Sequence, residues 1–216
     1  MEKAMGKIMT AAAETRAAAG TMTNFRWKIA FLIFLISFVA YMDRVNLSVA
    51  TPVIMQEFGF TKIDMGFIQT CFFASYALMQ VPGGILAEKF GMRKTGAFAI
   101  LWWSVFTALT ALAKGKISFA AVRLAFGLGE GPVFPSLGAA TFTWFNKHEK
   151  GKASSSILLG TFFGPVVGPV ATVALMGLFG WHAVFIIFGL VGVVLAWVWH
   201  LSLIHISEPT RLDVIS

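Results

Sequence analysis

The chain has 216 residues, of which 57% are hydrophobic and 12% are charged, and its mean hydropathy is +0.79. Ordinary soluble domains are roughly 45–50% apolar and about 25% charged. This composition leaves too little polar surface for a water-soluble globule, so it excludes a soluble enzyme, a nucleic-acid-binding module and a disordered chain. The single cysteine, Cys71, excludes a disulfide framework.

Residues 1–28 differ from the rest because they are rich in alanine and in basic side chains. We expect a cytoplasmic tail here rather than a signal peptide. The apolar run that follows is too long for a signal sequence, and no small-residue cleavage site ends it. Met22 is an alternative start, since it directly precedes the basic residues Arg26 and Lys28.

Six apolar stretches follow the tail. A membrane-spanning helix needs about 20 apolar residues, and none of the stretches alternates apolar and polar residues as an outer-membrane β-strand does. Residues 29–200 are therefore predicted to form an all-α membrane protein with six transmembrane helices. The stretches are 29–50, 65–87, 95–113, 118–145, 154–179 and 181–200.

The lysines and arginines outside these stretches predict an orientation. They are concentrated in the tail and in the loops 88–94 and 146–152, whereas the loops on the other side carry few. Because cytoplasmic loops are enriched in Lys and Arg, both ends of the six-helix unit are expected in the cytoplasm. The net charge of +7 is then an orientation signal rather than a sign of nucleic-acid binding.

Four ionisable residues lie inside the predicted spans: Asp43, Arg44, Arg123 and Glu130. Each costs ~2.5–3.5 kcal/mol at the membrane centre, so such residues usually face the bundle interior. With about 1.5 Å of rise per residue, Asp43, Arg44 and Arg123 fall at similar depths and Glu130 falls nearer the midplane. Arg123 and Glu130 also share one helix face. The pattern predicts one site built by two helices, and two purely structural ion pairs are the alternative.

The chemistry of these groups suits an organic anion. An arginine stays charged and can grip a carboxylate through two hydrogen bonds, so Arg44 and Arg123 are candidate substrate-binding residues. Burial favours the neutral form of a carboxyl group, whereas a neighbouring arginine favours its charged form. Asp43 and Glu130 are therefore candidate proton-coupling residues, which exchange protons as the arginines alternate between carboxylate and substrate.

Three uncharged polar residues on nearby apolar faces complete the predicted site. Tyr41, Tyr76 and Gln80 supply hydroxyl and amide groups for substrate binding, although ordinary packing would also account for the two tyrosines. The sequence shows neither a nucleophile paired with a base nor a cluster of metal ligands. We therefore predict neither an enzyme nor a cofactor or metal site.

The loop between the second and third stretches carries a spaced motif. It resembles the cytoplasmic loop signature of the major facilitator superfamily, Gly-x-x-x-Asp-Arg-x-Gly-x-Arg-Lys, with Glu and Lys in place of the Asp–Arg pair. A basic loop with a glycine turn would account for the basic residues but not for the spaced glycines and the acid. The resemblance implies a gating loop whose charge contacts lock one conformation. Its residues are Gly84, Glu88, Lys89, Gly91, Arg93 and Lys94.

The fifth stretch resembles the glycine-proline stretch of the same superfamily. Gly160, Gly164 and Gly168 recur every fourth residue, and Pro165 lies among them. Small residues permit close helix packing, and proline interrupts the helical hydrogen bonds. We expect a packing role here and no substrate contact.

Two further motifs narrow the resemblance. Residues 41–48 (YMDRVNLS) and 123–135 (RLAFGLGEGPVFP) are similar to the anion:cation symporter family, which includes bacterial galactonate, glucarate and hexuronate carriers and animal organic-anion carriers. The resemblance covers residues 25–200. It implies that Asp43, Arg44, Arg123 and Glu130 line the central cavity, with the carboxylates in proton coupling and the arginines in substrate binding.

The composition changes abruptly after His200. Residues 201–211 match the translation of a transposase adapter used in sequencing libraries, so residues 201–216 are predicted to be a non-native tail. The alternative is an amphipathic linker between transporter halves. On the first interpretation, His205 and Glu208 are not part of a site.

The superfamily fold has twelve helices in two six-helix halves, each a 3+3 inverted repeat. The chain is accordingly predicted to be the N-terminal half of a proton-coupled symporter for a sugar acid such as galactonate, glucarate or a hexuronate, in the cytoplasmic (inner) membrane. Its expected partners are the small anion, protons, the bilayer and the missing C-terminal half, without which no transport is expected. A membrane sensor or scaffold, uptake of another carboxylate such as an aromatic acid, and a homodimer of six-helix units are the alternatives.

Overall fold

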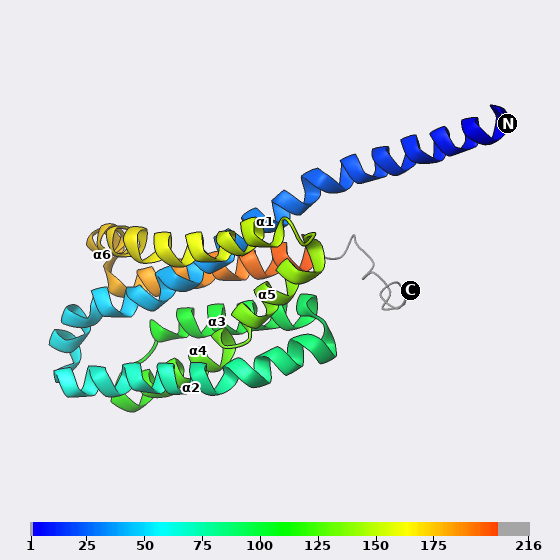
Figure 1. The fold of residues 1–216 in the computed structure, drawn as a ribbon. Coiled ribbons are helices and arrows are strands. Elements are labelled where there is room, and N and C mark those ends of the chain that lie inside the picture. Colours follow the sequence, from blue (N-terminus) through cyan, green and yellow to red (C-terminus); the bar gives the residue numbers. More distant parts are fainter. Residues whose placement is uncertain (1, 203–216) are drawn as a thin grey trace.

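The computed structural model describes residues 2–202, with side chains from residue 26 onward. This part of the chain is helical with short turns and contains no strand, and its long helices lie side by side in an elongated bundle (Figure 1). The prediction of an all-helical fold is confirmed. The helices are α1 (Glu2–Phe58), α2 (Lys62–Phe90), α3 (Met92–Thr110), α4 (Lys116–Glu130), α5 (Val133–Trp144) and α6 (Lys150–Ser202).

The predicted apolar stretches fall largely in these helices, and one of them is divided. The fourth stretch is divided between α4 and α5, because Pro132 has no N–H with which to continue the hydrogen bonds of α4. The fifth and sixth stretches both lie in α6, and the turn of α6 at Gly180 falls at the predicted boundary between them. There the backbone adopts φ 79° and ψ 166°, a conformation that glycine tolerates without a steric cost.

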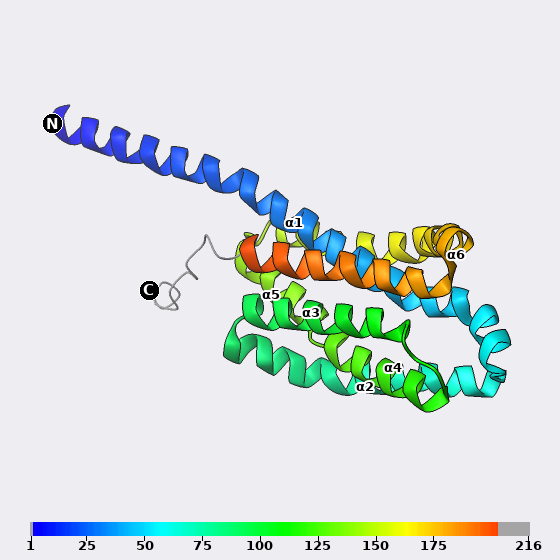
Figure 2. The same ribbon diagram turned by 180° about the vertical axis from the view of Figure 1, so that it is seen from behind.

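The turn at Gly180 divides α6 into a first arm (residues 150–179) and a second arm (residues 181–202). Figures 1 and 2, which view the bundle from opposite sides, show that the two arms fold back on each other. A straight helix of 53 residues would be roughly 80 Å long. Because of the turn, each arm of α6 is similar in length to the neighbouring helices.

Four helical segments of the described chain are long and apolar enough to cross a membrane. α3 is not among them, although it is long enough, because Arg93 and Lys94 at its start lower its mean hydropathy. The segment that contains α4 also contains α5, and α6 counts as one segment. The four are Arg26–Phe58, Lys62–Phe90, Lys116–Trp144 and Lys150–Ser202.

Glycines bring the backbones of neighbouring helices into contact. A Cβ atom added to Gly160 in the first arm of α6 would lie 2.6 Å from the Phe34 carbonyl oxygen of α1. On Gly127 of α4 it would lie 2.6 Å from the Phe72 carbonyl oxygen of α2. Because side chains are absent at these points, α1 packs tightly on the first arm of α6, and α2 packs tightly on α4.

The second arm of α6 packs on α3 in the same way. A Cβ on Gly189 would lie 2.8 Å from the Ser104 carbonyl oxygen. The large buried side chains of Trp103 and Trp199 fill the space between α3 and this arm, within the main hydrophobic core. Every long helix thus has a close-packed partner, which fixes the interior faces that carry the site.

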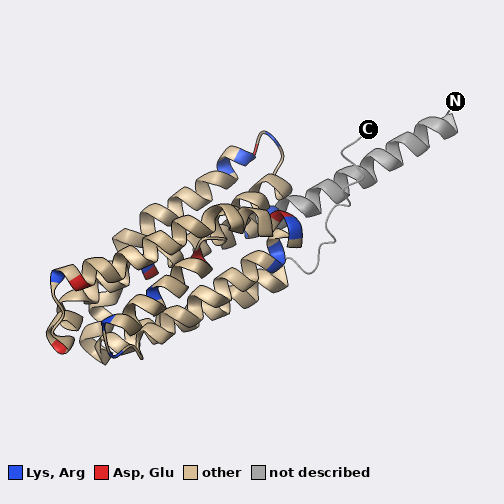
Figure 3. Cartoon of the chain, turned by 90° about the horizontal axis from the view of Figure 1, so that it is seen from below, with Lys and Arg blue, Asp and Glu red and all other residues tan. Residues whose placement is uncertain are grey.

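Charged side chains gather at the two ends of the bundle (Figure 3). At the end where the tail joins, Arg26 Nη1 lies 2.7 Å from Glu149 Oε2. At the opposite end Lys116 forms an ion pair with Asp64. Few charges lie between the ends, and those that do belong to the predicted site.

Two predictions fall at the edges of the described chain. The predicted alternative start at Met22 lies among residues whose side chains the structure does not describe, and residues 203–216, with His205 and Glu208, lie outside the described residues. The tail boundaries at residues 28 and 201 stay predictions.

Candidate functional site

The four charged residues of the predicted spans lie in the interior, carried by α1 and α4. Asp43 and Glu130 are buried, with 1% and 0% of their surfaces exposed, and Arg123 is 2% exposed. The Arg44 side chain keeps 15% of its surface exposed. The site therefore contains two cations and two acidic groups almost wholly removed from water.

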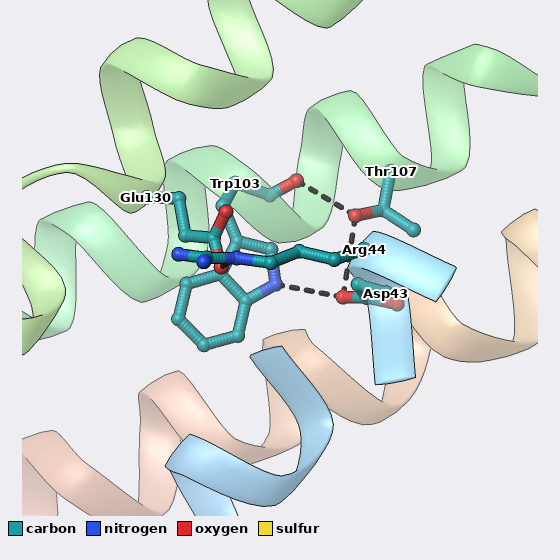
Figure 4. A network of polar contacts seen from close by, with 5 residues as sticks. All are labelled: Asp43, Arg44, Trp103, Thr107 and Glu130. Atoms are coloured by element: carbon teal, nitrogen blue, oxygen red, sulfur yellow. Dashed lines mark hydrogen bonds and ion pairs between the residues drawn. The ribbon is translucent and has the colours of Figure 1, made fainter. Parts of the chain in front are cut away.

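Arg44 and Glu130 form an ion pair between α1 and α4 (Figure 4). Arg44 Nε donates to Glu130 Oε1 at 2.8 Å. Arg44 Nη2 and Glu130 Oε2 are buried without a hydrogen-bond partner in the described chain. The pair is thus held by one hydrogen bond. A bidentate pair would also have joined the Arg44 Nη2 donor to the Glu130 Oε2 acceptor.

Aromatic rings surround the Arg44 guanidinium. Its Cζ atom lies 4.3 Å from the Tyr76 ring centroid and 4.6 Å from that of Tyr41. The rings of Phe72 and Phe134 lie at 5.6 Å each. Such contacts attract a cation through the ring faces, so the rings of α1, α2 and α5 hold Arg44 in place. The sequence predicted the two tyrosines here but not the two phenylalanines.

Asp43 lies in a different environment, because its hydrogen bonds come from neutral groups. Trp103 Nε1 donates to Asp43 Oδ2 at 3.0 Å, and the Thr107 hydroxyl lies 3.4 Å from the same oxygen (Figure 4). Asn46 Nδ2 donates to Asp43 Oδ1 at 3.3 Å. Asn46 in turn accepts a hydrogen bond from the Thr172 hydroxyl of α6 at 2.6 Å.

The sequence reasoning missed these three partners of Asp43, and Thr172 behind Asn46. Asn46 stands three residues after Asp43, on the same face of α1. Trp103 and Thr107 stand four residues apart on α3, so they also share a face. A search for polar residues at helical spacing within apolar stretches would have found them as candidates.

Arg123 is buried without a hydrogen-bonded partner. Its Cζ lies 5.1 Å from the Phe126 ring and 5.7 Å from the Phe185 ring. Its Nε is unpaired, and no described carboxylate lies within ion-pair distance of its guanidinium. A buried cation whose N–H groups are unmet is costly, and this arrangement leaves donors for an anion that enters the site.

The remaining predicted site residues lie around this centre. Gln80 is half-buried on α2, one turn after Tyr76 and on the same face, and it makes no hydrogen bond to a described residue. A Cβ on Gly164 would lie 2.7 Å from Tyr41 Cβ, so the first arm of α6 supports that tyrosine from behind. Gly168, one turn after Gly164, packs on Met42, and Pro165 is half-buried in the same arm.

The predicted gating loop forms the tight connection between α2 and α3. Gly91 ends α2 with φ 84°, and the Thr95 hydroxyl donates back to the Leu86 carbonyl at 3.0 Å. Arg93 Nη2 lies 3.4 Å from His200 Nε2. The carboxylate of Glu88 forms no ion pair with the described part of the chain.

The other residues of the loop motif face outward. The side chains of Lys89 and Lys94 are exposed, with Lys89 Nζ 5.5 Å from the Phe90 ring, whereas Gly84 is half-buried in α2. The loop therefore ties α3 to the second arm of α6 through Arg93 and leaves its other charges in solvent. Over residues 2–202 there is no group of three or more His, Cys, Asp or Glu side chains that could hold a metal ion.

Comparison with known proteins identifies the family. The model of the Major Facilitator Superfamily matches residues 33–214. The chain is 34% identical over 203 residues to a probable galactarate/D-glucarate transporter of Bacillus subtilis, covering 89% of this chain and 43% of that protein. It is 34% identical over 187 residues to a D-galactonate transporter of Escherichia coli, covering 87% of this chain and 43% of that one.

Another relative has a different substrate in its name. A sodium-dependent phosphate transport protein of Arabidopsis thaliana chloroplasts is 34% identical over 176 residues, covering 81% of this chain and 34% of that protein. The chain thus spans less than half the length of these relatives. Its fold also matches a solved bacterial homologue of the human lysosomal transporter Spinster in an inward-facing, unoccupied conformation, with a TM-score of 0.76, 21% identity and coverage of 87% of this chain and 44% of that one.

These comparisons confirm the resemblance seen in the motifs. The relatives are transporters rather than enzymes, and the chain is a multi-pass membrane protein. The family model and the relatives cover most of its length. The chain belongs to the Major Facilitator Superfamily.

Proposed function

We propose that the chain forms the substrate-binding first half of a proton-coupled symporter for a sugar acid. The observation that carries this proposal is the pairing of a singly bonded Arg44–Glu130 contact with a partnerless, buried Arg123. Two guanidinium groups with spare donors fit an anion that carries one or two carboxylates. The names of the relatives, galactarate/D-glucarate and D-galactonate transporters, favour sugar acids as that anion.

In the proposed cycle, the substrate carboxylate competes with Glu130 for Arg44. When the anion takes the Arg44 donors, Glu130 is left buried without its cation, and it binds a proton because an isolated buried carboxylate is unfavourable. Asp43, which is held by neutral donors, binds the second proton. Tyr41, Tyr76 and Gln80 offer hydrogen bonds to the sugar-acid hydroxyls. Binding of the anion and binding of the protons are thereby linked.

We further propose that the chain crosses the membrane six times as a 3+3 inverted repeat. The folded-back arms of α6 supply two crossings, and α4 with α5 supplies one. The helix pairing supports the repeat, since α1 packs on the first arm of α6 through glycines and α4 packs on α2 through glycines. In such a repeat the first three crossings (α1, α2, α3) correspond to the last three (α4 with α5, and the two arms of α6). The pair formed by α1 and the first arm of α6 then corresponds to the pair formed by α4 and α2. The charged residues then lie on equivalent crossings, α1 and α4.

The proposed location is the cytoplasmic membrane, with both ends of the six-crossing unit in the cytoplasm. Arg26 begins the described part of the bundle, and Arg93 follows at the α2–α3 connection, together with the exposed Lys89 and Lys94. Because cytoplasmic segments are enriched in such residues, the end of the bundle that carries them faces the cytoplasm. The second six-helix half would close the cavity from the other side.

Binding by the purified chain in nanodiscs tests the anion site. Calorimetric titration with D-glucarate, galactarate and D-galactonate is expected to show binding, and neutral D-galactose is expected to show none. Arg123→Met is expected to abolish binding, whereas Lys147→Ala, which changes an exposed cation outside the site, leaves it intact. Binding of inorganic phosphate in place of the sugar acids would assign the site to a different anion.

Uptake tests the coupling to protons. The chain is co-expressed with the second half of the E. coli D-galactonate transporter, and vesicles are given an acid-outside gradient. Accumulation of D-galactonate that disappears with Asp43→Asn supports symport, and the chain alone is expected to accumulate none. If accumulation proceeds equally without the gradient, the proton coupling is wrong. If the combined protein binds the anion but never moves it, the sensor or scaffold function is favoured.

A further inference from the structure

A chain of three buried side chains joins Asp43 to α6. The Thr172 hydroxyl donates to Asn46 Oδ1 at 2.6 Å, and Asn46 Nδ2 donates to Asp43 Oδ1 at 3.3 Å. All three residues are buried. Both hydrogen bonds run toward Asp43, so their direction requires the carboxylate to act as the final acceptor.

Thr172 is placed differently from other buried threonines of the bundle. Thr110 and Thr141 each donate to the carbonyl four residues earlier in their own helix, at 3.0 Å. Thr172 instead donates across to α1, one turn beyond Gly168 on the face through which the glycines of α6 pack. A polar contact thus extends the close-packed seam between α1 and the first arm of α6.

The two oxygens of Asp43 differ in the donors directed at them. Oδ2 accepts from the Trp103 indole N–H, which can only donate, and from the Thr107 hydroxyl. Oδ1 has one donor, the Asn46 amide, so we take Oδ1 as the oxygen that binds the proton. The new O–H group then needs an acceptor, but it faces the NH₂ group of Asn46, which has none.

We propose that Asn46 and Thr172 are positioning residues that transmit the protonation of Asp43 to α6 by reversal of the Asn46 amide. After reversal, the amide oxygen accepts from the protonated Asp43, and the NH₂ group donates to the Thr172 hydroxyl oxygen. The Thr172 hydrogen then turns to the Gly168 carbonyl, as in the other buried threonines. This inference rests on the proposed proton coupling.

The charges that act on Asp43 come from α4. Arg123 and Glu130 are the charged groups that face it from that helix, while Arg44 is its neighbour on α1. Over the described residues, α3 contributes Trp103 and Thr107, and α6 acts through Thr172, all uncharged. A pH-dependent change at Asn46 that requires Asp43 is therefore lost when Asp43 alone is substituted and Glu130 is kept.

The sequence suits a direct test, because the chain has three asparagines: Asn24, Asn46 and Asn146. The chain is labelled with ¹⁵N-asparagine and reconstituted in nanodiscs, and the side-chain NH₂ signals are followed by NMR as the pH is lowered. The Asn46 signal, assigned with Asn46→Gln, is expected to show a transition that Asp43→Asn abolishes. The other two asparagines serve as references.

Substitutions at Thr172 complete the test. Thr172→Val is expected to move the midpoint of the Asn46 transition by about half a pH unit or more, and Thr172→Ser, which keeps the hydroxyl, restores it. Thr141→Val is the matched control and leaves the midpoint unchanged. A pH-independent Asn46 signal, a transition that persists in Asp43→Asn, or an unmoved midpoint in Thr172→Val would overturn the relay. The proposed symport would still stand if gradient-driven uptake were retained in the same preparations.

Discussion

Arg44 and Arg123 are both removed from most of the solvent, yet their surroundings are opposite. Arg44 has a carboxylate at 2.8 Å and two aromatic rings within 5 Å of its Cζ atom. Arg123 has ring neighbours but no hydrogen-bonded acceptor in the described chain. Removal of a partner from a buried pair strands the other charge, whereas removal of an unpaired charge strands nothing. The two arginines should therefore respond differently to substitution.

Arg44→Ala is expected to lower the free energy of unfolding by about 3–5 kcal/mol, because Glu130 is left buried and unpaired. The double variant Arg44→Ala/Glu130→Ala should lose less than the sum of the single losses. Reversible unfolding in mixed detergent micelles measures all three. Lys116→Ala, at a half-exposed pair, is the control and should cost at most about 1 kcal/mol. Additive losses at Arg44 and Glu130 would show that the pair is not coupled.

Arg123→Met is expected to change the free energy of unfolding by less than about 1 kcal/mol, since the gain from removing a buried cation offsets the lost attraction to the two acids. The same variant should lose all measurable binding of D-glucarate. Denaturation and calorimetry on one preparation measure both effects. A loss of stability as large as that of Arg44→Ala would assign Arg123 a structural role.

Individual site residues could be predicted from the sequence where a charged residue occurs within an apolar stretch. Asp43, Arg44, Arg123 and Glu130 stand out because charges are rare in apolar stretches. Trp103 and Thr107 share a helix face, but the sequence does not show which neighbour that face meets. Their role depends on the rotation of α3 about its axis, which its neighbours determine through packing.

Among the helices, the contact between α1 and the first arm of α6 depends on missing side chains. Gly160 and Gly164 each leave room for a main-chain carbonyl of α1. Hydropathy predicted the helix, and the spacing of these glycines predicted its close packing. The partner helix could not be predicted from the sequence, because these glycines permit close packing against any helix without large side chains at the contact.

Gly164→Ala is expected to destabilise the chain by about 1–3 kcal/mol, because overpacking forces backbones apart. Its Cβ would meet the Phe38 carbonyl oxygen at 2.7 Å. Gly177→Ala in the same arm is the matched control, since nothing lies within 4 Å of its added Cβ. That control should be neutral or stabilising by about 0.5–1 kcal/mol. Equal effects of the two substitutions in thermal unfolding would contradict the tight contact.

The turn in α6 and the divided fourth stretch show what boundary prediction could and could not reach. The predicted boundary at Gly180 coincides with the turn in α6, whereas apolar composition continues through Pro132, so the break before α5 was not predicted. The Gly180 turn needs a positive φ, and the break needs a missing N–H. Both signals are present as residue types, but glycine and proline also occur within these helices without breaking them, as at Pro165.

For the molecule as a whole, the charged ends define an axis. Arg26, Glu149, Arg93 and His200 lie at one end, and Asp64 and Lys116 pair at the other. The connections that turn at each end follow from the order of the helices. The asymmetry of Lys and Arg between the ends was visible in the sequence, whereas the pairing of the end residues was not.

Cysteine labelling in cells tests the proposed orientation. Cys71→Ser removes the single native thiol, and the exposed Asn146 and Lys62 are then replaced by cysteine in separate variants. A membrane-impermeant maleimide is expected to label Lys62→Cys in intact cells and Asn146→Cys only after lysis. The reverse pattern would invert the orientation, and labelling of both in intact cells would contradict an odd number of crossings between them.

The break after α4 has a consequence for the ion pair beside it. Glu130 is the last residue of α4, and Pro132 and Pro135 supply no N–H for the carbonyls of Leu128 and Gly131. Carbonyl groups left free at a helix end carry partial negative charge. The helix end that carries Glu130 thus combines a fixed partial charge with a carboxylate that can be neutralised. In the proposed cycle, a proton on Glu130 removes the carboxylate charge that holds Arg44, whereas the partial charge of the helix end stays.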